Sequence, residues 1–170
     1  MLKVLLNDKS ASDSRILKRF NNKKLPYVSG LEIQGQSIYN VCPGKVVAVG
    51  QEANKTYSVS VLVNDKQMIR YTNLEYADVV SGQSVTFNTY IGRCKKFVRL
   101  EYCTLDRHQS IWPVRIKDKL MYKQDPEGLL NGTTKLVLYF DNTGETDHTD
   151  SIYYDNPMME YELTNNKGDD

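Results

Sequence analysis

The sequence predicts an all-β or β-dominated domain built on an antiparallel sheet. Between Ile38 and Cys103, apolar and polar residues alternate with a period of two over several short runs, and Gly, Asn-Asp and Ser-Gly steps separate these runs. This pattern is typical of β-strands joined by tight turns. Helical periodicity is scarce, and only Arg15 to Phe20 and the residues around Glu127 to Leu130 show it.

The N-terminal residues predict a short strand followed by a short helix. Leu2 to Leu6 is apolar enough for a strand, and Asp13-Ser14 can cap a helix over Arg15 to Phe20. Leu25-Pro26-Tyr27 then starts an extended segment, because the residue before a proline avoids the helical region. Gly30 turns this segment.

The central residues predict a series of strands, and the clearest pair is a hairpin. In Tyr57 to Val63 the odd positions are apolar, so one face of this strand is expected to be buried. Asn64-Asp65 predicts a turn into a strand over Gln67 to Asn73, and the two runs have similar length. The other expected strands are Ile38–Val41, Lys45–Val49, Tyr90–Gly92 and Lys96–Tyr102. Between them, Ala77–Val80 and Ser84–Thr86 are expected to form a connection with short extended pieces.

The C-terminal third predicts a few further elements and then a change of composition. Trp112 to Ile116 extends the ordered region, Tyr122 to Leu130 predicts a turn and a short helix, and Lys135 to Phe140 predicts an apolar strand. From Asp141 onward acidic residues dominate, with Tyr and Met among them. We therefore divide the chain into a basic N-terminal extension over 1–26, a β domain over 27–130, and a C-terminal strand with an acidic tail over 131–170.

The charge of the chain gives no global indication of a partner. The net charge is +1, which implies binding to neither nucleic acid nor a membrane. The ends differ, however: residues 1–24 have a net charge of +5 from seven Lys or Arg and two Asp, and residues 141–170 have −8 from nine acids and one Lys. Two solvated ends account for this difference, although complementary ends could also pair between subunits, which leaves self-association open.

The cysteines and the N-terminus indicate a protein made in a reducing compartment. The three cysteines, Cys42, Cys94 and Cys103, include no C-x-x-C pair, and their odd number argues against a disulfide framework. The apolar run near the N-terminus, Val4 to Leu6, has three residues, which is far shorter than the apolar part of a signal peptide. We expect synthesis in the cytoplasm without secretion.

Short motifs occur in a particular order along the chain. They are G-L-E at Gly30 to Glu32, Y-T-N-L at Tyr71 to Leu74, V-S-G-Q-S-V at Val80 to Val85 followed by Ile91-Gly92, and R-L-E at Arg99 to Glu101. In this order they resemble the frame of the LytM/lysostaphin-like, M23-type zinc endopeptidases of peptidoglycan. The resemblance covers about residues 27–130 and implies a LytM-like antiparallel β-sheet domain with short N-terminal and C-terminal extensions.

The residues that this family uses for chemistry are replaced. Its first zinc-binding His corresponds to Val28, its zinc-binding Asp to Glu32, and the His of its Y-x-H-L motif to Asn73. Its H-x-H pair corresponds to Phe97 and Arg99. A hydrolytic zinc site needs about three N or O ligands and an open position for water. A guanidinium stays protonated and repels a metal ion. The resemblance therefore implies no zinc, no other cofactor and no catalytic residue.

No other chemistry replaces the lost zinc site in the sequence. We interpret His108 and His148, which lie outside the frame, as surface histidines. Cys94 and Cys103 lie near Lys95-Lys96, which could lower a thiol pKa, but an idle thiol is the preferred interpretation. We expect a remnant groove without catalytic function. Its residues are Glu32, Tyr71, Asn73 and Arg99.

These observations predict a protein that is not an enzyme. The main hypothesis is a structural component of a bacteriophage virion, in the tail hub, tip or baseplate, made in the host cytoplasm and bound to other tail or baseplate proteins through its charged ends. Phage tails and baseplates often carry peptidoglycan hydrolase modules, and by analogy an inactive module could persist there as a structural part. The second hypothesis is a non-catalytic pseudopeptidase that binds peptidoglycan or a peptide. A cytoplasmic enzyme of unrelated type is disfavoured, because no cluster of His, Cys or acidic residues converges in the sequence.

Overall fold

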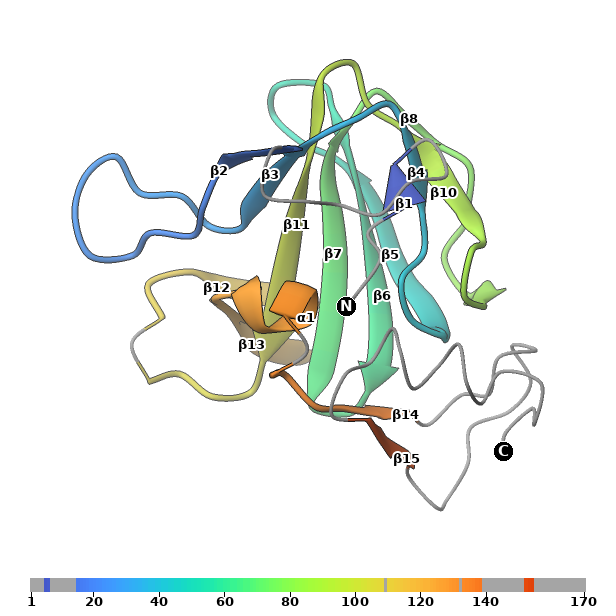
Figure 1. Cartoon of the computed structure of the whole chain (residues 1–170). Coiled ribbons are helices and arrows are strands. Elements are labelled where there is room, and N and C mark those ends of the chain that lie inside the picture. Colours follow the sequence, from blue (N-terminus) through green and yellow to red (C-terminus); the bar gives the residue numbers. More distant parts are fainter. Residues whose placement is uncertain (1–4, 7–14, 109, 132, 139–151, 155–170) are drawn as a thin grey trace.

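Strands dominate the protein, as the sequence predicts (Figure 1). The computed structural model describes residues 5–6, 15–108, 110–131, 133–138 and 152–154. Within these residues one α-helix is present, α1 (Glu127–Asn131), and it is too short to cross a membrane. The strands are β1 (Leu5–Leu6), β2 (Ile16–Lys18), β3 (Leu31–Gln34), β4 (Ser37–Tyr39), β5 (Gly44–Gln51), β6 (Tyr57–Asn64), β7 (Gln67–Leu74), β8 (Tyr76–Ala77), β9 (Ser84–Val85), β10 (Tyr90–Arg93), β11 (Phe97–Thr104), β12 (Pro113–Ile116), β13 (Lys119–Gln124), β14 (Leu136–Leu138) and β15 (Ile152–Tyr154).

The main sheet is antiparallel and has the long strands β5, β6, β7 and β11 at its centre (Figure 1). Its order is β12-β13-β11-β7-β6-β5-β9, with β3 paired to β11 and β2 paired to β3. One edge of β11 pairs with β7. The other edge is divided, because β3 pairs with Phe97–Leu100 and β13 pairs with Tyr102–Thr104. Strands from distant parts of the sequence therefore meet along β11.

The predicted hairpin is confirmed by the pairing of β6 with β7. Asn64 pairs with Gln67, so the two central turn residues are Asp65 and Lys66, one position later than the sequence indicates. Asn64 shapes the turn, since its Oδ1 accepts a hydrogen bond of 2.7 Å from the backbone N–H of Lys66.

The hydrophobic core lies between the main sheet and a smaller sheet of order β1-β4-β10-β8. The main sheet contributes residues that alternate along its strands, and the smaller sheet contributes Ile38 and Ile91. All of the following side chains are 0% exposed: Leu31, Ile33, Val59, Val61, Ile69, Tyr71, Val98 and Leu100. A second apolar cluster, formed by Met68, Cys103 and Met121, includes Val114 and Ile116 of the β12–β13 hairpin at its edge.

The predicted helix over Arg15 to Phe20 is wrong, because Ile16–Lys18 forms strand β2. Six residues are too few for a helix that lacks tertiary support. The edge of β3 instead offers backbone partners, and Ile16 packs against the core. Of the strand predicted over Leu2 to Leu6, the described part is β1 (Leu5–Leu6). The predicted cap, Asp13-Ser14, lies outside the described residues.

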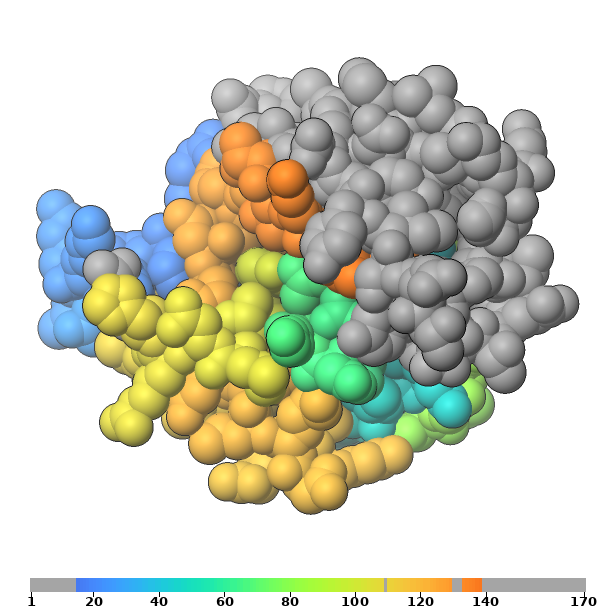
Figure 2. Space-filling model, turned by 90° about the horizontal axis from the view of Figure 1, so that it is seen from below, coloured from blue at the N-terminus to red at the C-terminus, as the bar shows by residue number. Residues whose placement is uncertain are grey.

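The apolar segment after residue 132 packs onto the domain. Leu136 and Leu138 of β14 belong to the main core. Side chains of the β6–β7 turn bind the backbone of β14: Asn64 donates to the carbonyl of Val137 at 2.6 Å, and Gln67 donates to the carbonyl of Lys135 at 2.8 Å. Figure 2 views this end, where the green β6–β7 turn is bordered by yellow and orange segments from later in the chain. Apart from β15, the acidic tail lies outside the described residues.

Candidate functional site

One face of the main sheet carries polar residues at positions that alternate with the core. Two rows cross the strands on this face. Ser60, Arg70 and Glu101 are paired across β6, β7 and β11. Thr72, Arg99 and Glu32 are paired across β7, β11 and β3. Since side chains alternate between the two faces of a strand, the residues between these positions point into the core.

The first row contains a buried network of charges. Arg70 Nη1 lies 2.6 Å from Glu101 Oε1, and Lys123 Nζ lies 3.0 Å from Glu101 Oε2. The Ser29 hydroxyl also donates to Glu101 Oε2 at 2.7 Å, and Arg70 Nε donates to the Ser60 hydroxyl at 3.1 Å. The side chains of Glu101, Arg70 and Lys123 are 2%, 10% and 16% exposed. Two cations thus share one buried carboxylate.

The second row brings Glu32 and Arg99 into contact. Arg99 Nη2 and Nε both donate to Glu32 Oε2, at 2.8 and 3.2 Å. The side chain of Glu32 is 8% exposed and that of Arg99 is 33% exposed. Glu32 is the one acid left from the ligand set that the resemblance implies. Its carboxylate is paired with a guanidinium in this structure.

Asn73 lines the same face but uses its side chain to support the backbone. A β-bulge lies between the Tyr57 and Val59 pairings of β6 with β7, and Asn73 has a φ of 68° there. Asn tolerates this left-handed conformation better than most residues. Its Nδ2 donates to the carbonyl of Phe97 at 2.9 Å, which ties the bulge to β11.

Tyr71 does not belong to the groove. It points into the core and is fully buried, because it lies between Arg70 and Thr72 on an alternating strand. Its hydroxyl donates to Asn40 Oδ1 at 3.0 Å and accepts from the backbone N–H of Val41 at 3.0 Å. A strict period of two would place Tyr71 and Asn73 together on the core face. The bulge at Asn73 interrupts that period, so Asn73 lines the groove while Tyr71 stays in the core.

A cavity of about 300 Å³ opens over the polar face. Its floor includes Arg70, Thr72, Asn73, Arg99, Glu101 and Lys123. Ser29 and the loop between β5 and β6, with Glu52, Ala53, Asn54 and Thr56, complete it. A neighbouring cavity of about 290 Å³ shares Asn54, Thr56 and Asn73 with it. The two cavities therefore form a polar groove along the end of the β5–β6 hairpin.

The described residues contain no group of three or more His, Cys, Asp or Glu placed to hold a metal ion. Val28 forms an isolated β-bridge with Asn21, and Phe97 is half-buried at the start of β11. His108 is exposed in the loop after β11, and its backbone N–H bonds Asp106. His148 lies outside the part of the chain that the structure describes.

The three cysteines are free and buried. Burial raises the pKa of Cys94 to about 11 and that of Cys103 to about 12. Burial also raises the pKa of Cys42. The nearby lysines therefore do not activate Cys94 or Cys103, and the idle-thiol interpretation fits the structure.

The sequence patterns did not indicate Arg70, Lys123 or Ser29 as parts of this face. They included Glu101 in the R-L-E motif but did not indicate its buried charge network. The alternation with Arg99 was enough to place Glu101 on the polar face. Arg70 could be found in the same way, because it interrupts the apolar run of β7. The contacts of Ser29 and Lys123 with Glu101 join positions 72 and 22 residues apart, and no local pattern indicates them.

Comparison with known structures identifies the architecture. Lysostaphin from Staphylococcus simulans superposes with a TM-score of 0.52 at 16% identity, over 67% of this chain and 48% of lysostaphin. The fold is that of the LytM-like peptidase domains. The catalytic domain of lysostaphin alone gives a TM-score of 0.51 at 17% identity, over 67% of this chain and 90% of that domain.

A second relative by structure comes from a prophage. The catalytic domain of the prophage-encoded M23 protein EnpA from Enterococcus faecalis, in the form of a point mutant, superposes with a TM-score of 0.50 at 14% identity. The match covers 66% of this chain and 88% of that domain. At such identities the likeness shows the fold alone. No family model and no curated protein matches the sequence.

Proposed function

We propose that the chain is a non-catalytic protein built on a peptidoglycan-hydrolase-like domain. This proposal rests on the contact between Arg99 and Glu32, in which Nε and Nη2 of Arg99 both donate to Glu32 Oε2. A zinc ion bound by Glu32 would have to displace this guanidinium, which cannot give up its charge. The positive charge of Arg99 would also repel the ion at the same carboxylate.

Metal analysis and a hydrolysis assay test the absence of catalysis. We expect protein purified without chelator to contain no stoichiometric zinc and to leave the turbidity of cell-wall suspensions unchanged. The catalytic domain of lysostaphin serves as the positive control for both measurements. Stoichiometric zinc together with lysis would show that the chain is a peptidase with a rebuilt site.

For the biological role we propose a structural part of a bacteriophage virion, in the tail hub, tip or baseplate, with other tail or baseplate proteins as partners. Two observations support this role. A prophage encodes an M23 protein with the same fold. The ends of the sequence carry opposite net charges, +5 over residues 1–24 and −8 over residues 141–170, which favour partners of complementary charge.

Assembly can be tested by truncation. Removal of residues 155–170 leaves every described strand in place, so the domain should fold normally. We expect the truncated chain to be absent from purified particles in which the full chain is present. Arg99→Gln serves as the control for the groove. Normal incorporation of the truncated chain, with loss of incorporation for Arg99→Gln, would show that the groove docks the protein instead.

A second candidate function is a binding module, and the polar groove favours it. The two cavities that share Asn54, Thr56 and Asn73 extend over buried charged side chains, which is unusual for a surface that only covers a core. Sedimentation with purified cell walls tests this function. Protein in the pellet that is released by soluble wall fragments would support it, and protein that stays in the supernatant would exclude it.

A further inference from the structure

Among the described residues, Arg70 has one nitrogen without a hydrogen-bonded partner at normal distance. Its Nε donates to Ser60 and its Nη1 donates to Glu101. Its Nη2 lies 4.0 Å from Glu52 Oε2, which is longer than a hydrogen bond. Arg70 is 10% exposed and lines the cavity of about 300 Å³. A nearly buried guanidinium therefore keeps donor capacity beside an open space.

Two cations beneath this cavity share one buried carboxylate, and the second carboxylate, Glu52, lies at the rim. Glu101 neutralises one of the two cations that contact it, Arg70 or Lys123, but not both. A buried cation that shares its counterion with another cation is only partly compensated, so such an arrangement gains from an added anion. Glu52 approaches from the rim, but its side chain is 48% exposed and a pair of that kind contributes little. The site is thus complementary to a further negative group.

We propose that the cavity binds the terminal carboxylate of a peptide. The carboxylate lies between Arg70 Nη2 and Lys123 Nζ and takes the place of the loosely held Glu52 side chain. Guanidinium and ammonium donors form strong hydrogen bonds with carboxylates. Thr72 and Asn73, on the same floor, lie beside the neighbouring peptide group. A volume of about 300 Å³ suits the end of a peptide.

This inference rests on the second proposed function and names its ligand class. The decisive probes are acetyl-alanyl-alanine with a free carboxylate and the same peptide with a C-terminal amide. Titration of the full chain, followed by NMR chemical shifts, gives both dissociation constants. We expect the acid to bind at least about tenfold more tightly than the amide, because the amide loses a charge-assisted hydrogen bond.

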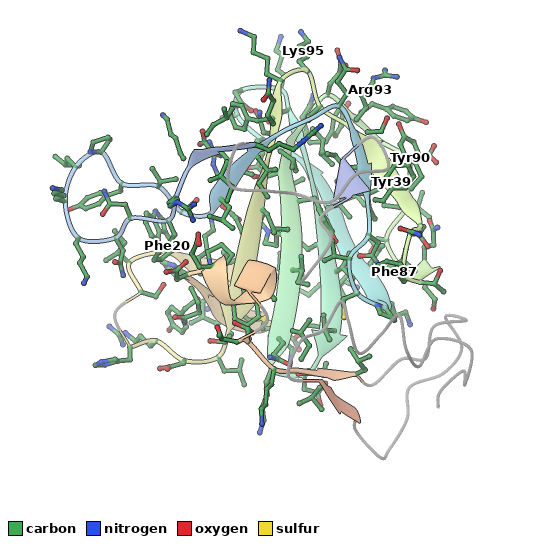
Figure 3. All side chains as sticks on the ribbon, viewed as in Figure 1. Phe20, Tyr39, Phe87, Tyr90, Arg93 and Lys95 are labelled. Atoms are coloured by element: carbon green, nitrogen blue, oxygen red, sulfur yellow. The ribbon has the colours of Figure 1, made fainter. Side chains whose placement is uncertain are left out.

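Single substitutions locate the site. Lys123→Gln should weaken binding of the acid about tenfold, since it removes one of the two donors. Glu52→Gln should tighten binding about two- to fivefold, because the competing carboxylate is gone. The matched control is Lys96→Gln, which removes the same charge at a different cavity, lined by Arg15, Lys95 and Lys96. Figure 3 labels Lys95 at the turn between β10 and β11, where this control lies.

Four results would overturn the inference. They are equal binding of acid and amide, no binding of either, equal weakening by Lys96→Gln and Lys123→Gln, and binding of inorganic phosphate in place of the peptide acid. Thermal unfolding of each variant shows whether its fold is intact. If the peptide acid binds but cell walls do not retain the protein, the wall-binding function fails and the carboxylate site stands.

Discussion

The two faces of the main sheet are made by the same strands and are stabilised in different ways. On β7 and β11, Ile69, Tyr71 and Leu100 point into the core and are fully buried, whereas Arg70 and Glu101 point to the groove. Both sets are largely hidden from water. Burial alone therefore does not distinguish the core from the candidate site. The two differ in the kind of side chain that is buried, which is apolar in the core and charged at Arg70 and Glu101.

The difference has an energetic consequence. Apolar side chains gain about 25 cal/mol for each Å² of buried area, whatever their neighbour is, so the core face tolerates conservative changes. A buried charge is stabilised only while its partner is present. The groove face should therefore respond to the loss of one charge more strongly than to a change of side-chain size.

The largest expected effect is that of Glu101→Gln. The substitution keeps the shape but leaves Arg70 and Lys123 without their common carboxylate. We expect the free energy of unfolding to fall by about 3–5 kcal/mol, as measured by urea unfolding.

The control for this prediction removes the opposite charge as well. Arg70→Met combined with Glu101→Leu replaces the pair with apolar side chains, and Lys123, at 16% exposure, can turn toward water. The double variant should be more stable than Glu101→Gln. If the double variant is less stable than Glu101→Gln, the charged network stabilises the fold by more than the cost of leaving its cations unpaired, which contradicts the prediction.

The next effect is on the opposite face, at Tyr71. Tyr71→Phe leaves Asn40 Oδ1 and the N–H of Val41 without the hydroxyl that both contact. We expect a loss of about 1–3 kcal/mol in urea unfolding. Binding of acetyl-alanyl-alanine should not change, since Tyr71 points away from the groove. Weaker peptide binding in a folded Tyr71→Phe variant would contradict the separation of the two faces.

Substitution of Asn73, at the bulge that lines the groove, should have a smaller effect on stability. Asn73→Ala and Asn73→Gly both lose the hydrogen bond to Phe97. At a φ of 68°, alanine is strained and glycine is not, so Ala should be about 1 kcal/mol less stable than Gly. Thermal unfolding of the two variants measures this difference, and equal stability would indicate that the bulge relaxes.

The smallest expected signal is the reactivity of the buried thiols. Because burial raises the pKa of Cys94 to about 11 and that of Cys103 to about 12, both stay protonated at pH 8. Alkylation by iodoacetamide at pH 8 should be much slower in the native protein than in urea. Its rate should still rise above pH 9, with Cys94 labelled first. Labelling that is equally fast in both states would mean that the thiols are accessible.

The sequence by itself determined the long central strands of the main sheet and the hairpin between two of them. The period of two in Tyr57 to Val63 and Gln67 to Thr72 specifies which side chains share a face, because neighbouring residues of a strand point in opposite directions. Asn73 departs from this period at the bulge. The order of the short motifs then indicated the LytM-like fold, which the structural neighbours confirm. It also singled out Glu32 and Arg99, which the structure brings together.

The tertiary structure alone decided the features that depend on contacts distant in the sequence. Ile16–Lys18 is a strand because the edge of β3 is available, and its own residues would equally suit a helical turn. Lys123 joins the groove because β13 pairs with the end of β11, which brings its ammonium group to Glu101. Local sequence patterns indicate to which face of its own strand a side chain points. They do not indicate which strand pairs with that strand. The pairing decides whether a charged side chain lies next to an opposite charge, the apolar core or a cavity.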